Sequence, residues 1–434
     1  MVATDAVVRR FADERWTAGV IGLGYVGLPL AMTASRAGLD VIGFDVAADR
    51  VAALNEGRSH VEDVTDAELA TALAAGARFT ADEADLAAAD AIFIAVPSPL
   101  GRNRQPDMSY IEAAAATVGR IARAGQLIAL ESTTYPGTTD EHLVPAVAQA
   151  GLTLDVDVFL AFSPERIDPG NVLQTHEIPK IVGGVTDTSG EVAAAAYGRM
   201  VERIHRVGSA RAAELTKLLE NTYRSVNIAL VNELAQLAHA FDVDIWEVVD
   251  AAATKPFGFQ PFYPGPGVGG HCIPLDPQFL AWRARELRAP TRFIDLAEDV
   301  NIHMPDYVVA RVVEQLNGDG RSVKGAKVLG VGVAYKRNIA DDRESPSRDV
   351  LARLAGRGAD VGVHDPLVDP DRLARDGYTV VGGLDELDGF DLAIVLTDHD
   401  AVDYAALADR VPLVFDTRGV YRRLGLGPAN VVTL

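Results

Sequence analysis

Short apolar runs alternate with helix-period segments over the first third of the chain. Val20–Ile21 is followed by a glycine-rich turn, by apolar positions at helical spacing and, after Gly38, by a second apolar run at Val41–Phe44. Two further runs, Ala91–Val96 and Leu127–Leu130, have the length of buried strands. The alternation predicts a parallel sheet covered by helices.

The last third repeats this pattern, and the middle does not. From Lys327 an apolar run leads into a helical segment at Ser347–Gly356 and then into a second run that ends at Asp365. Between the two thirds, Ala210–Ala240 has apolar residues at helical spacing and contains neither Pro nor Gly, so it predicts one long helix. We therefore expect an α/β protein with two Rossmann-like, doubly wound parallel-sheet domains joined by a central helical region. The expected domains are residues 1–205, 206–305 and 306–434.

Composition and charge narrow the possible functions. The 434 residues include 40 Lys and Arg against 61 Asp and Glu, a formal charge of −21, which argues against nucleic-acid or anionic-membrane binding. The single cysteine, Cys272, excludes an intramolecular disulfide framework and fits a reducing compartment. Because the chain starts with a charged segment and has no run of about 18 uncharged apolar residues, we expect a cytoplasmic protein. The nine histidines show no metal-ligand spacing, so no metal site is expected.

The first glycine-rich turn has the pattern of a dinucleotide site. Gly22, Gly24 and Gly27 form GxGxxG between a strand and a helix, where backbone can approach a pyrophosphate at the helix N-terminus. Asp45 ends the next strand, where a carboxylate binds the ribose hydroxyls and repels a 2′-phosphate. NAD is therefore favoured over NADP, although Arg50 lies nearby and weakens that preference. A bare glycine-rich turn is the weaker interpretation.

Two other segments carry candidate chemistry. Ser98 and Thr133 follow neighbouring strands and are expected near a nicotinamide, unless they only cap helices. Further on, a glycine-rich loop ends at Cys272, with Asp276 four residues later. The glycines permit close backbone approach to a ligand. A helix starting near residues 273–274 would favour the thiolate, whereas most lone cysteines are buried and inert.

The last domain departs from the first at its glycine turn. Gly330 and Gly332 occupy the first two positions of the pattern, but Tyr335 stands where the third glycine belongs. This indicates either a nucleotide bound differently or a structural domain without a ligand.

Taken together, these segments resemble the UDP-glucose/GDP-mannose dehydrogenase family of NAD-dependent nucleotide-sugar 6-dehydrogenases. The resemblance extends from about Gly22 to Arg418. It rests on the motifs GLGYVGLPLA, AVPSPL, ESTTYPGTT, AFSPERIDPGN, the Lys217 and Asn221 pair in the long helix, YPGPGVGGHCIPLDP, GVAYKRNIADDRESP and FDTRG.

The resemblance implies a four-electron oxidation of a sugar C6 alcohol with two NAD+, through a thiohemiacetal and then a thioester on Cys272. It implies that Lys217 and Asn221 stabilise the oxyanion, Asp276 assists proton transfer, Thr133 orders a water and Glu165 acts as a base. The implied cofactor contacts are Gly22, Gly24, Tyr25, Val26, Gly27, Asp45, Arg50, Pro97, Ser98, Thr133 and Arg343. The implied substrate contacts are Glu165, Arg166, Lys217, Asn221, Phe262, Tyr263, Gly269, Lys336 and Arg418.

The motif combination is most similar to the branch that acts on UDP-N-acetylhexosamines, and UDP-N-acetylglucosamine is the first choice. UDP-glucose, UDP-N-acetylmannosamine and UDP-N-acetylgalactosamine remain alternatives. Lys255 is a further candidate substrate contact, and a homodimer or larger homo-oligomer is expected from the family. Two other classes stay open: a single-step NAD hydroxyacid dehydrogenase, and an inactive NAD-sensing protein.

Overall fold

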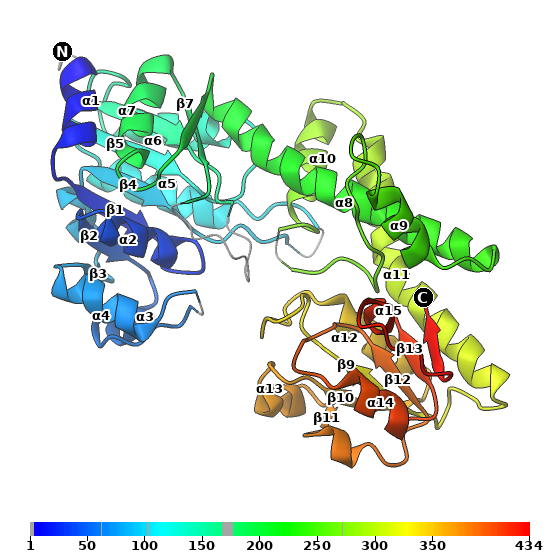
Figure 1. Cartoon of the computed structure of the whole chain (residues 1–434). Helices are drawn as coiled ribbons and strands as arrows, with labels where there is room; N and C mark the ends of the chain where they lie inside the picture. The colour runs from blue at the N-terminus through cyan, green and yellow to red at the C-terminus, as the bar shows by residue number, and fades with distance from the viewer. Residues whose placement is uncertain (1–3, 62, 102–103, 167–176, 271) are drawn as a thin grey trace. The chain divides into compact units, whose positions relative to one another are not determined.

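The computed structural model describes residues 4–61, 63–101, 104–166, 177–270 and 272–434. The chain divides into two compact units, which are described separately (Figure 1). Unit 1 contains residues 1–220 and 278–289, and unit 2 contains residues 221–277 and 290–434. Parts of the SPERIDPGN motif, from residue 167 onward, and His271 lie outside the described residues.

Unit 1 is built on an eight-stranded sheet with the order β3-β2-β1-β4-β5-β6-β7-β8. All neighbours are parallel except β6 and β7, which pair antiparallel. The antiparallel step places the start of β7 beside the carboxyl end of β6, the edge where ligands bind in open α/β sheets. The strands are β1 Thr17–Ile21, β2 Asp40–Phe44, β3 Arg78–Thr80, β4 Ala91–Ile94, β5 Gln126–Leu130, β6 Val158–Phe162, β7 Lys180–Gly184 and β8 Ile204–Val207.

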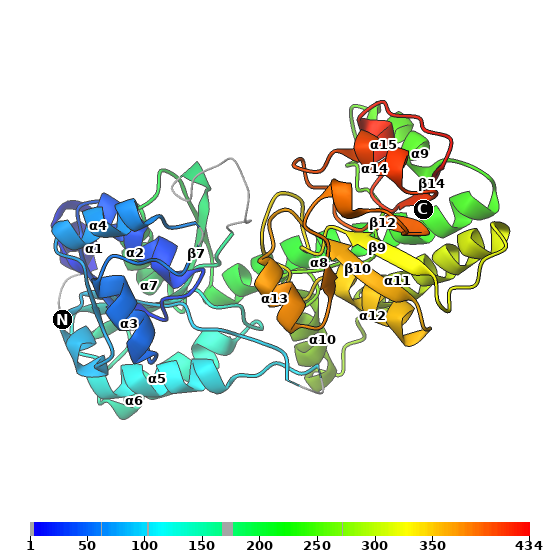
Figure 2. The same ribbon diagram turned by 90° about the horizontal axis from the view of Figure 1, so that it is seen from below.

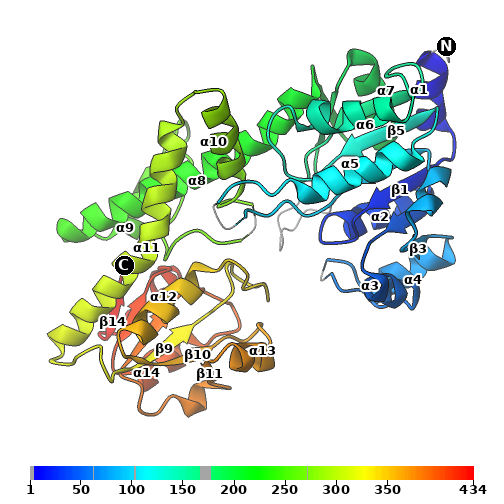
Figure 3. The same ribbon diagram turned by 180° about the vertical axis from the view of Figure 1, so that it is seen from behind.

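Helices cover both faces of this sheet (Figure 3). Apolar residues of α1, α2, α4 and α7 form one core with the strands, and those of α5 and α6 form a second core on the opposite face. The strands β4, β5, β6 and β7 are fully buried because they are covered on both sides, whereas the edge strands β3 and β8 are partly exposed. The helical segments are α1 Thr4–Asp13, α2 Gly27–Arg36, α3 Ala48–Asn55, α4 Asp66–Ala74, η1 Glu83–Ala88, α5 Ser109–Ile121, η2 Thr139–Leu143, α6 Val144–Gln149 and α7 Asp187–Tyr197.

Unit 2 contains a six-stranded parallel sheet with the order β11-β10-β9-β12-β13-β14. One face packs against α11, α12 and α13, and the other packs against α14 and α15 (Figure 2). The strands are β9 Lys327–Val331, β10 Asp360–His364, β11 Thr379–Val380, β12 Leu392–Val395, β13 Val414–Asp416 and β14 Val431–Thr433. The accompanying helices are α11 Arg292–Gly318, α12 Pro346–Gly356, α13 Pro370–Arg375, η4 Leu384–Glu386, α14 Tyr404–Arg410 and α15 Val420–Arg423.

Three more helices lie between the sheets in the chain: α8 (Ala210–Ala240), α9 (Ile245–Ala253) and α10 (Asp276–Glu286). The unit boundary falls within α8, between residues 220 and 221. The predicted α/β fold with two Rossmann-like sheets and a long central helix is confirmed, and α8 has the predicted bounds. Among the described residues, no helix is both long and apolar enough to cross a membrane.

Candidate active site

The glycines of the turn after β1 differ in the space around them. Gly22 has φ 90°, and a Cβ there would lie 2.6 Å from the Ala95 carbonyl oxygen. A Cβ on Gly27 would lie 1.8 Å from the Gly22 carbonyl oxygen, so the start of α2 packs directly on the turn. A Cβ on Gly24, by contrast, would meet no atom within 4 Å. The turn therefore leaves open space over Gly24, which fits a pyrophosphate held at the start of α2.

Asp45 is held as an ionised carboxylate at the end of β2. Its Oδ2 accepts hydrogen bonds from the Leu23 N–H at 2.9 Å and from Arg50 at 2.8 Å, and its Oδ1 accepts one from the Ala47 N–H at 2.9 Å. Burial alone would raise the pKa of Asp45, but these hydrogen bonds outweigh burial and lower it. Arg50 is paired with Asp45, so this edge fits the ribose hydroxyls of NAD better than a 2′-phosphate.

The loop after β5 is fastened to α8. Lys217 is buried and donates a hydrogen bond of 2.6 Å to the Thr133 hydroxyl. One turn earlier on α8, the Glu214 carboxylate accepts hydrogen bonds from the backbone N–H groups of Gly137 and Thr139. Burial raises the pKa of Glu214. The helix thus holds the loop at two points one turn apart. It brings together Thr133 and Lys217, two candidate catalytic residues.

Ser98 and Pro97 lie in the loop after the neighbouring strand, β4. The two loops are joined where the Ser132 hydroxyl donates 2.8 Å to the Val96 carbonyl oxygen. Because β4 and β5 are parallel neighbours, Ser98 and Thr133 belong to the same edge of the sheet.

Glu165 follows β6 and is held by its neighbour Arg166 and by Lys180, which the sequence did not single out. Lys180, the first residue of β7, donates 3.0 Å to Glu165 Oε2, and the Arg166 N–H donates 2.7 Å to Oε1. Arg166 itself forms a two-point ion pair with Glu220 of α8, at 2.7 and 3.2 Å. Arg166 is therefore bound to protein groups in this structure. A lysine that opens an apolar strand was the available signal for Lys180.

In unit 2, the cysteine and two of the candidate catalytic residues form a local group. Cys272 is exposed, and its carbonyl oxygen accepts a hydrogen bond of 2.9 Å from the Asp276 N–H. The buried Asp276 carboxylate accepts a hydrogen bond of 2.6 Å from the Asn221 amide. The helix begins at Asp276 rather than near residues 273–274, so Cys272 lies one turn ahead of it.

The glycine-rich loop before Cys272 packs against other parts of unit 2. A Cβ on Gly265 would lie 2.4 Å from the Arg418 guanidinium, and one on Gly269 would lie 2.7 Å from Pro346 and 2.8 Å from Tyr335. Packing leaves no room for a larger side chain at Gly269, whereas the group nearest to Gly265 is the end of the flexible Arg418 side chain. Close approach of this loop to a ligand stays a prediction. Phe262, at the start of the loop, packs edge-on against the Tyr223 ring.

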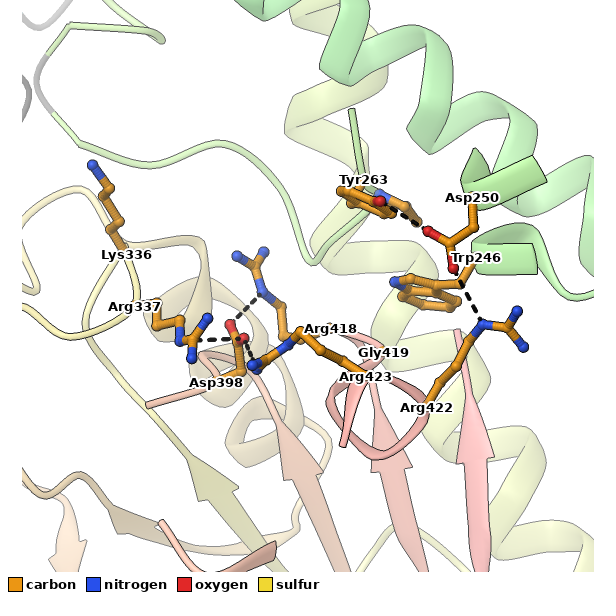
Figure 4. A pocket seen from close by; sticks show the side chains of 11 residues that line it. Trp246, Asp250, Tyr263, Lys336, Arg337, Asp398, Arg418, Gly419, Arg422 and Arg423 are labelled. Carbon is orange, nitrogen blue, oxygen red and sulfur yellow. Dashed lines mark hydrogen bonds and ion pairs between the residues drawn. The ribbon is translucent and has the colours of Figure 1, made fainter. Parts of the chain in front are cut away.

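A cavity of about 750 Å³ in unit 2 collects positive charge (Figure 4). Lys336 and Arg418, both predicted, line it, as does Tyr263, whose hydroxyl donates 2.8 Å to Asp250. Five cationic side chains face two carboxylates, so the cavity fits a polyanion although the whole chain is acidic. The residues lining the cavity are Trp246, Asp250, Tyr263, Pro264, Lys336, Arg337, Asp398, Arg418, Gly419, Arg422 and Arg423.

The remaining predicted contacts have partners of their own. Arg343 donates two hydrogen bonds to Asp341, at 2.8 and 2.7 Å. Lys255 lies with its ammonium 5.2 Å from the centre of the Phe257 ring. Tyr25 is exposed and Val26 precedes α2.

Asp365 of the second sheet is held by the adjacent turns in the same way as Asp45 of the first sheet. Asp365 Oδ2 accepts hydrogen bonds from the Val333 and Ala334 N–H groups at 2.6 and 3.1 Å and lies 3.3 Å from the buried His399 ring. Oδ1 accepts two more from the turn after β10. The difference lies in the turn after β9, where Tyr335 occupies the position of the third glycine. The second domain does not reproduce the first dinucleotide site.

A Rossmann-type dinucleotide turn, an exposed cysteine beside an Asn–Asp pair and a cationic cavity define a nucleotide-dependent oxidoreductase. Comparison with known families makes the assignment specific. The chain belongs to the UDP-glucose/GDP-mannose dehydrogenase family: residues 17–201 match its NAD binding domain, 211–303 its central domain and 329–423 its UDP binding domain. It is an NAD-dependent nucleotide-sugar 6-dehydrogenase, and the second sheet corresponds to a UDP-binding domain rather than to a structural domain without a ligand.

Similar proteins act on different sugars. The chain is 36% identical to UDP-N-acetyl-D-glucosamine 6-dehydrogenase of Pseudomonas aeruginosa, over 84% of this chain and 86% of that protein. It is 35% identical to NDP-N-acetyl-D-galactosaminuronic acid dehydrogenase of Ralstonia nicotianae, over 93% and 96%. The structure of UDP-D-ManNAc dehydrogenase from Pyrococcus horikoshii superposes with a TM-score of 0.87 at 31% identity, over 96% and 98%. These comparisons define the chemistry but do not select one sugar.

Proposed function

We propose that the chain oxidises the C6 alcohol of a UDP-N-acetylhexosamine, with UDP-N-acetylglucosamine as first choice, to the uronic acid. Each sugar consumes two NAD+ and one water and yields two NADH. The observation that carries the proposal is the local group in unit 2, where Cys272 is exposed one turn ahead of Asp276 and Asp276 is bonded to Asn221. Relatives named for three different N-acetylhexosamine derivatives support this substrate class.

Cys272 acts after the first oxidation. Its sulfur adds to the C6 aldehyde, and the thiohemiacetal that forms loses a hydride from C6 and a proton from its hydroxyl group to become a thioester. Water then breaks the carbon–sulfur bond and releases the carboxylate and the free thiol. A covalent thiolate intermediate divides one difficult oxidation into two easier steps. NAD+, when bound, accepts the electron pair in each of the two oxidations.

The polar side chains around the reacting carbon have separate catalytic roles. Lys217 and Asn221, one turn apart on α8, stabilise negative charge on the C6 oxygen. Asp276 assists proton transfer, Thr133 orders the attacking water, and Glu165 removes a proton from that water. The Lys217–Thr133 and Asn221–Asp276 hydrogen bonds fix two of these pairs in defined rotamers.

The two nucleotides bind through local features of an acidic chain. Gly22, Gly24, Tyr25, Val26, Gly27, Asp45, Arg50, Pro97, Ser98, Thr133 and Arg343 contact NAD. Lys336, Arg418 and Tyr263 hold the UDP moiety in the cationic cavity, and Glu165, Arg166, Phe262, Gly269 and, across a subunit interface, Lys255 contact the substrate. We also propose a cytoplasmic homodimer, in which the free thiol of Cys272 stays reduced.

A panel of UDP-sugars offered with NAD+ or NADP+ tests the proposal. Absorbance at 340 nm measures the reduced cofactor, and mass spectrometry of the product measures the oxidation state of C6. We expect two NADH per sugar, a uronic acid product and the highest kcat/KM on an N-acetylhexosamine. Cys272→Ser should release no uronic acid. One NADH per sugar with an aldehyde or ketone product would contradict the proposal. A higher kcat/KM on UDP-glucose than on the N-acetylhexosamines would show that the substrate is not a UDP-N-acetylhexosamine.

A further inference from the structure

Beside the proposed catalytic groups of unit 1 lies a buried ionic cluster whose charges do not balance. It consists of Glu131, Glu165, Lys180 and Tyr197. Lys180 Nζ donates 2.7 Å to Glu131 and 3.0 Å to Glu165, and the Tyr197 hydroxyl donates 2.6 Å to the other oxygen of Glu131. The three ionisable side chains of Lys180, Glu131 and Glu165 are 8%, 0% and 9% exposed. One ammonium therefore serves two buried carboxylates.

The sheet topology explains how the cluster assembles. Glu131 is the first residue after β5, Glu165 is the third residue after β6, and Lys180 is the first residue of β7. β5 and β6 are parallel neighbours, and β7 runs antiparallel to β6. The carboxyl ends of two strands and the beginning of the third therefore meet at one edge of the sheet. The cluster lies at the edge that also carries Thr133, two residues after Glu131.

We infer that Lys180 is a positioning residue for Glu165: Glu131 and Tyr197 hold its ammonium at the start of β7, and the ammonium orients the Glu165 carboxylate and keeps it ionised for work as a base. The inference rests on the proposed function, because it needs Glu165 to act on the water that hydrolyses the thioester.

A purely structural ion pair would need one carboxylate, not two. Buried charges are costly unless they are paired and hydrogen-bonded, and Glu131 with Tyr197 already satisfies Lys180 on one side. The Lys180 ammonium also lies 5.7 Å from the centre of the Tyr197 ring, which adds a cation–π contact. Burial lowers the pKa of Lys180, but attraction to Glu131 and Glu165 outweighs it and raises the pKa, so the ammonium is permanently charged.

The two carboxylates compete for the same ammonium, and this competition makes the inference testable. Glu131 is fully buried, which raises its pKa, and the nearby Glu165 raises it further although Lys180 acts in the opposite direction. Removing the Lys180 charge should make Glu165 harder to ionise. Removing the Glu131 charge should leave the whole ammonium to Glu165 and make it easier to ionise. The two substitutions are expected to shift the same titration in opposite directions.

The test uses the full-length variants Lys180→Met, Lys180→Arg and Glu131→Gln, with uronic acid release measured by quenched flow between pH 5 and 9. Lys180→Met should slow release about 10- to 100-fold, with the KM for the UDP-sugar changed less than threefold, and should move the acid limb of the rate profile to higher pH. The mass of the intact enzyme should show the thioester accumulating on Cys272. Glu131→Gln should move the acid limb to lower pH, and Lys180→Arg should restore most of the rate.

The inference is overturned if the acid limb of the pH–rate profile stays in place in both Lys180→Met and Glu131→Gln. It is also overturned if the limb moves in the same direction in both variants. If Lys180→Met does not fold, as judged by circular dichroism, an unchanged acid limb in Glu131→Gln overturns it alone. The wild-type stoichiometry separates the two proposals. If the wild type yields two NADH per sugar but the acid limbs of the variants do not move, only the role of Lys180 is contradicted. If the wild type releases no uronic acid from any UDP-sugar, the proposed function and this inference are both contradicted.

Discussion

At the scale of single residues, glycines in the same motif serve opposite purposes. A methyl group on Gly27 would overlap the Gly22 carbonyl oxygen, whereas one on Gly24 would meet no protein atom within 4 Å. We therefore expect Gly27→Ala to be destabilised by about 1–3 kcal/mol, as in other overpacked sites. Gly24→Ala should keep the wild-type melting temperature within about 1 °C and raise the KM for NAD+ at least about tenfold, because the methyl group fills cofactor space. Thermal unfolding and NAD+ kinetics measure both effects.

The informative comparison is between the two variants. Gly208→Ala is the matched control, because Gly208 also lacks a left-handed φ and a Cβ there would meet no atom within 4 Å. A Gly24→Ala protein with normal NAD+ kinetics would show that the space over the turn does not hold the cofactor.

Asp365 gives a pH-dependent prediction at the same scale. Burial would raise its pKa, but its hydrogen bonds with His399 and with the turn after β10 outweigh burial and lower it. Because the pKa of Asp365 is lower in the folded protein than in the unfolded chain, where it is about 3.8, its ionised carboxylate stabilises the fold at pH values above 3.8. This contribution is lost as the pH falls toward the folded pKa. Asp365→Asn should therefore be less stable by about 1–3 kcal/mol at pH 7, with a smaller deficit below pH 4. Urea unfolding across pH measures it, and the exposed Asp360→Asn should show no such trend.

Residue chemistry was predictable from sequence where it depends on neighbours in the chain. The glycine turn, Asp45 and the Lys217–Asn221 spacing follow from local patterns, and the structure places them in the expected elements. Lys180 and Glu131 were not predictable, because 49 residues separate them and only the antiparallel pairing of β7 brings them together. The cavity residues Trp246 and Arg422 were missed for the same reason, since they come from α9 and α15.

At the scale of elements, α8 holds the loop that carries Thr133. Glu214 is the anchor, and burial raises its pKa above 4.5. A raised carboxyl pKa means that the folded state binds the proton more tightly, so this group favours folding at low pH and less so as the pH rises through the folded pKa. We expect Glu214→Gln to be destabilised by about 1–3 kcal/mol near pH 4.5, with the deficit narrowing as the pH rises. Urea unfolding at several pH values measures this trend.

Glu233→Gln, at an exposed position of the same helix, is the matched control and should show no pH-dependent deficit. A loss of stability in Glu214→Gln that grows as the pH rises would contradict a raised pKa for Glu214. Since Glu214 precedes Lys217 by one turn, kcat should fall along with stability.

Elements themselves were predicted best where periodicity was long or the strands were fully buried. The helix α8 and strands β1, β2, β4 and β5 lie where the apolar pattern put them, with boundaries shifted by up to three residues. The reversal of β7 carries no local signature, because strand direction depends on how the connection returns to the sheet. The start of α10 was misjudged near residues 273–274, since a turn bonded to the Cys272 carbonyl precedes the helix.

At the scale of the whole molecule, the proposed homodimer has a concrete candidate surface. The second half of α8 exposes a stripe of large apolar side chains at helical spacing, and such a stripe is normally covered in a soluble protein. Their exposed fractions are 55% for Leu230, 42% for Leu234, 46% for Leu237 and 73% for Phe241. Pairing of two copies along this stripe would bury it against an identical surface, as twofold symmetry requires.

We expect the wild type to have twice the chain mass of 46.1 kDa, or a multiple of it, by light scattering at micromolar concentration. Leu234→Glu places a charge in the centre of the stripe and should shift the protein to the monomer, because an interface core excludes unpaired charge. Glu233→Gln, at the flank of the stripe, introduces no charge and should leave the mass unchanged. A monomeric wild type would rule out the dimer. An unchanged mass in Leu234→Glu would show that the interface does not include this stripe.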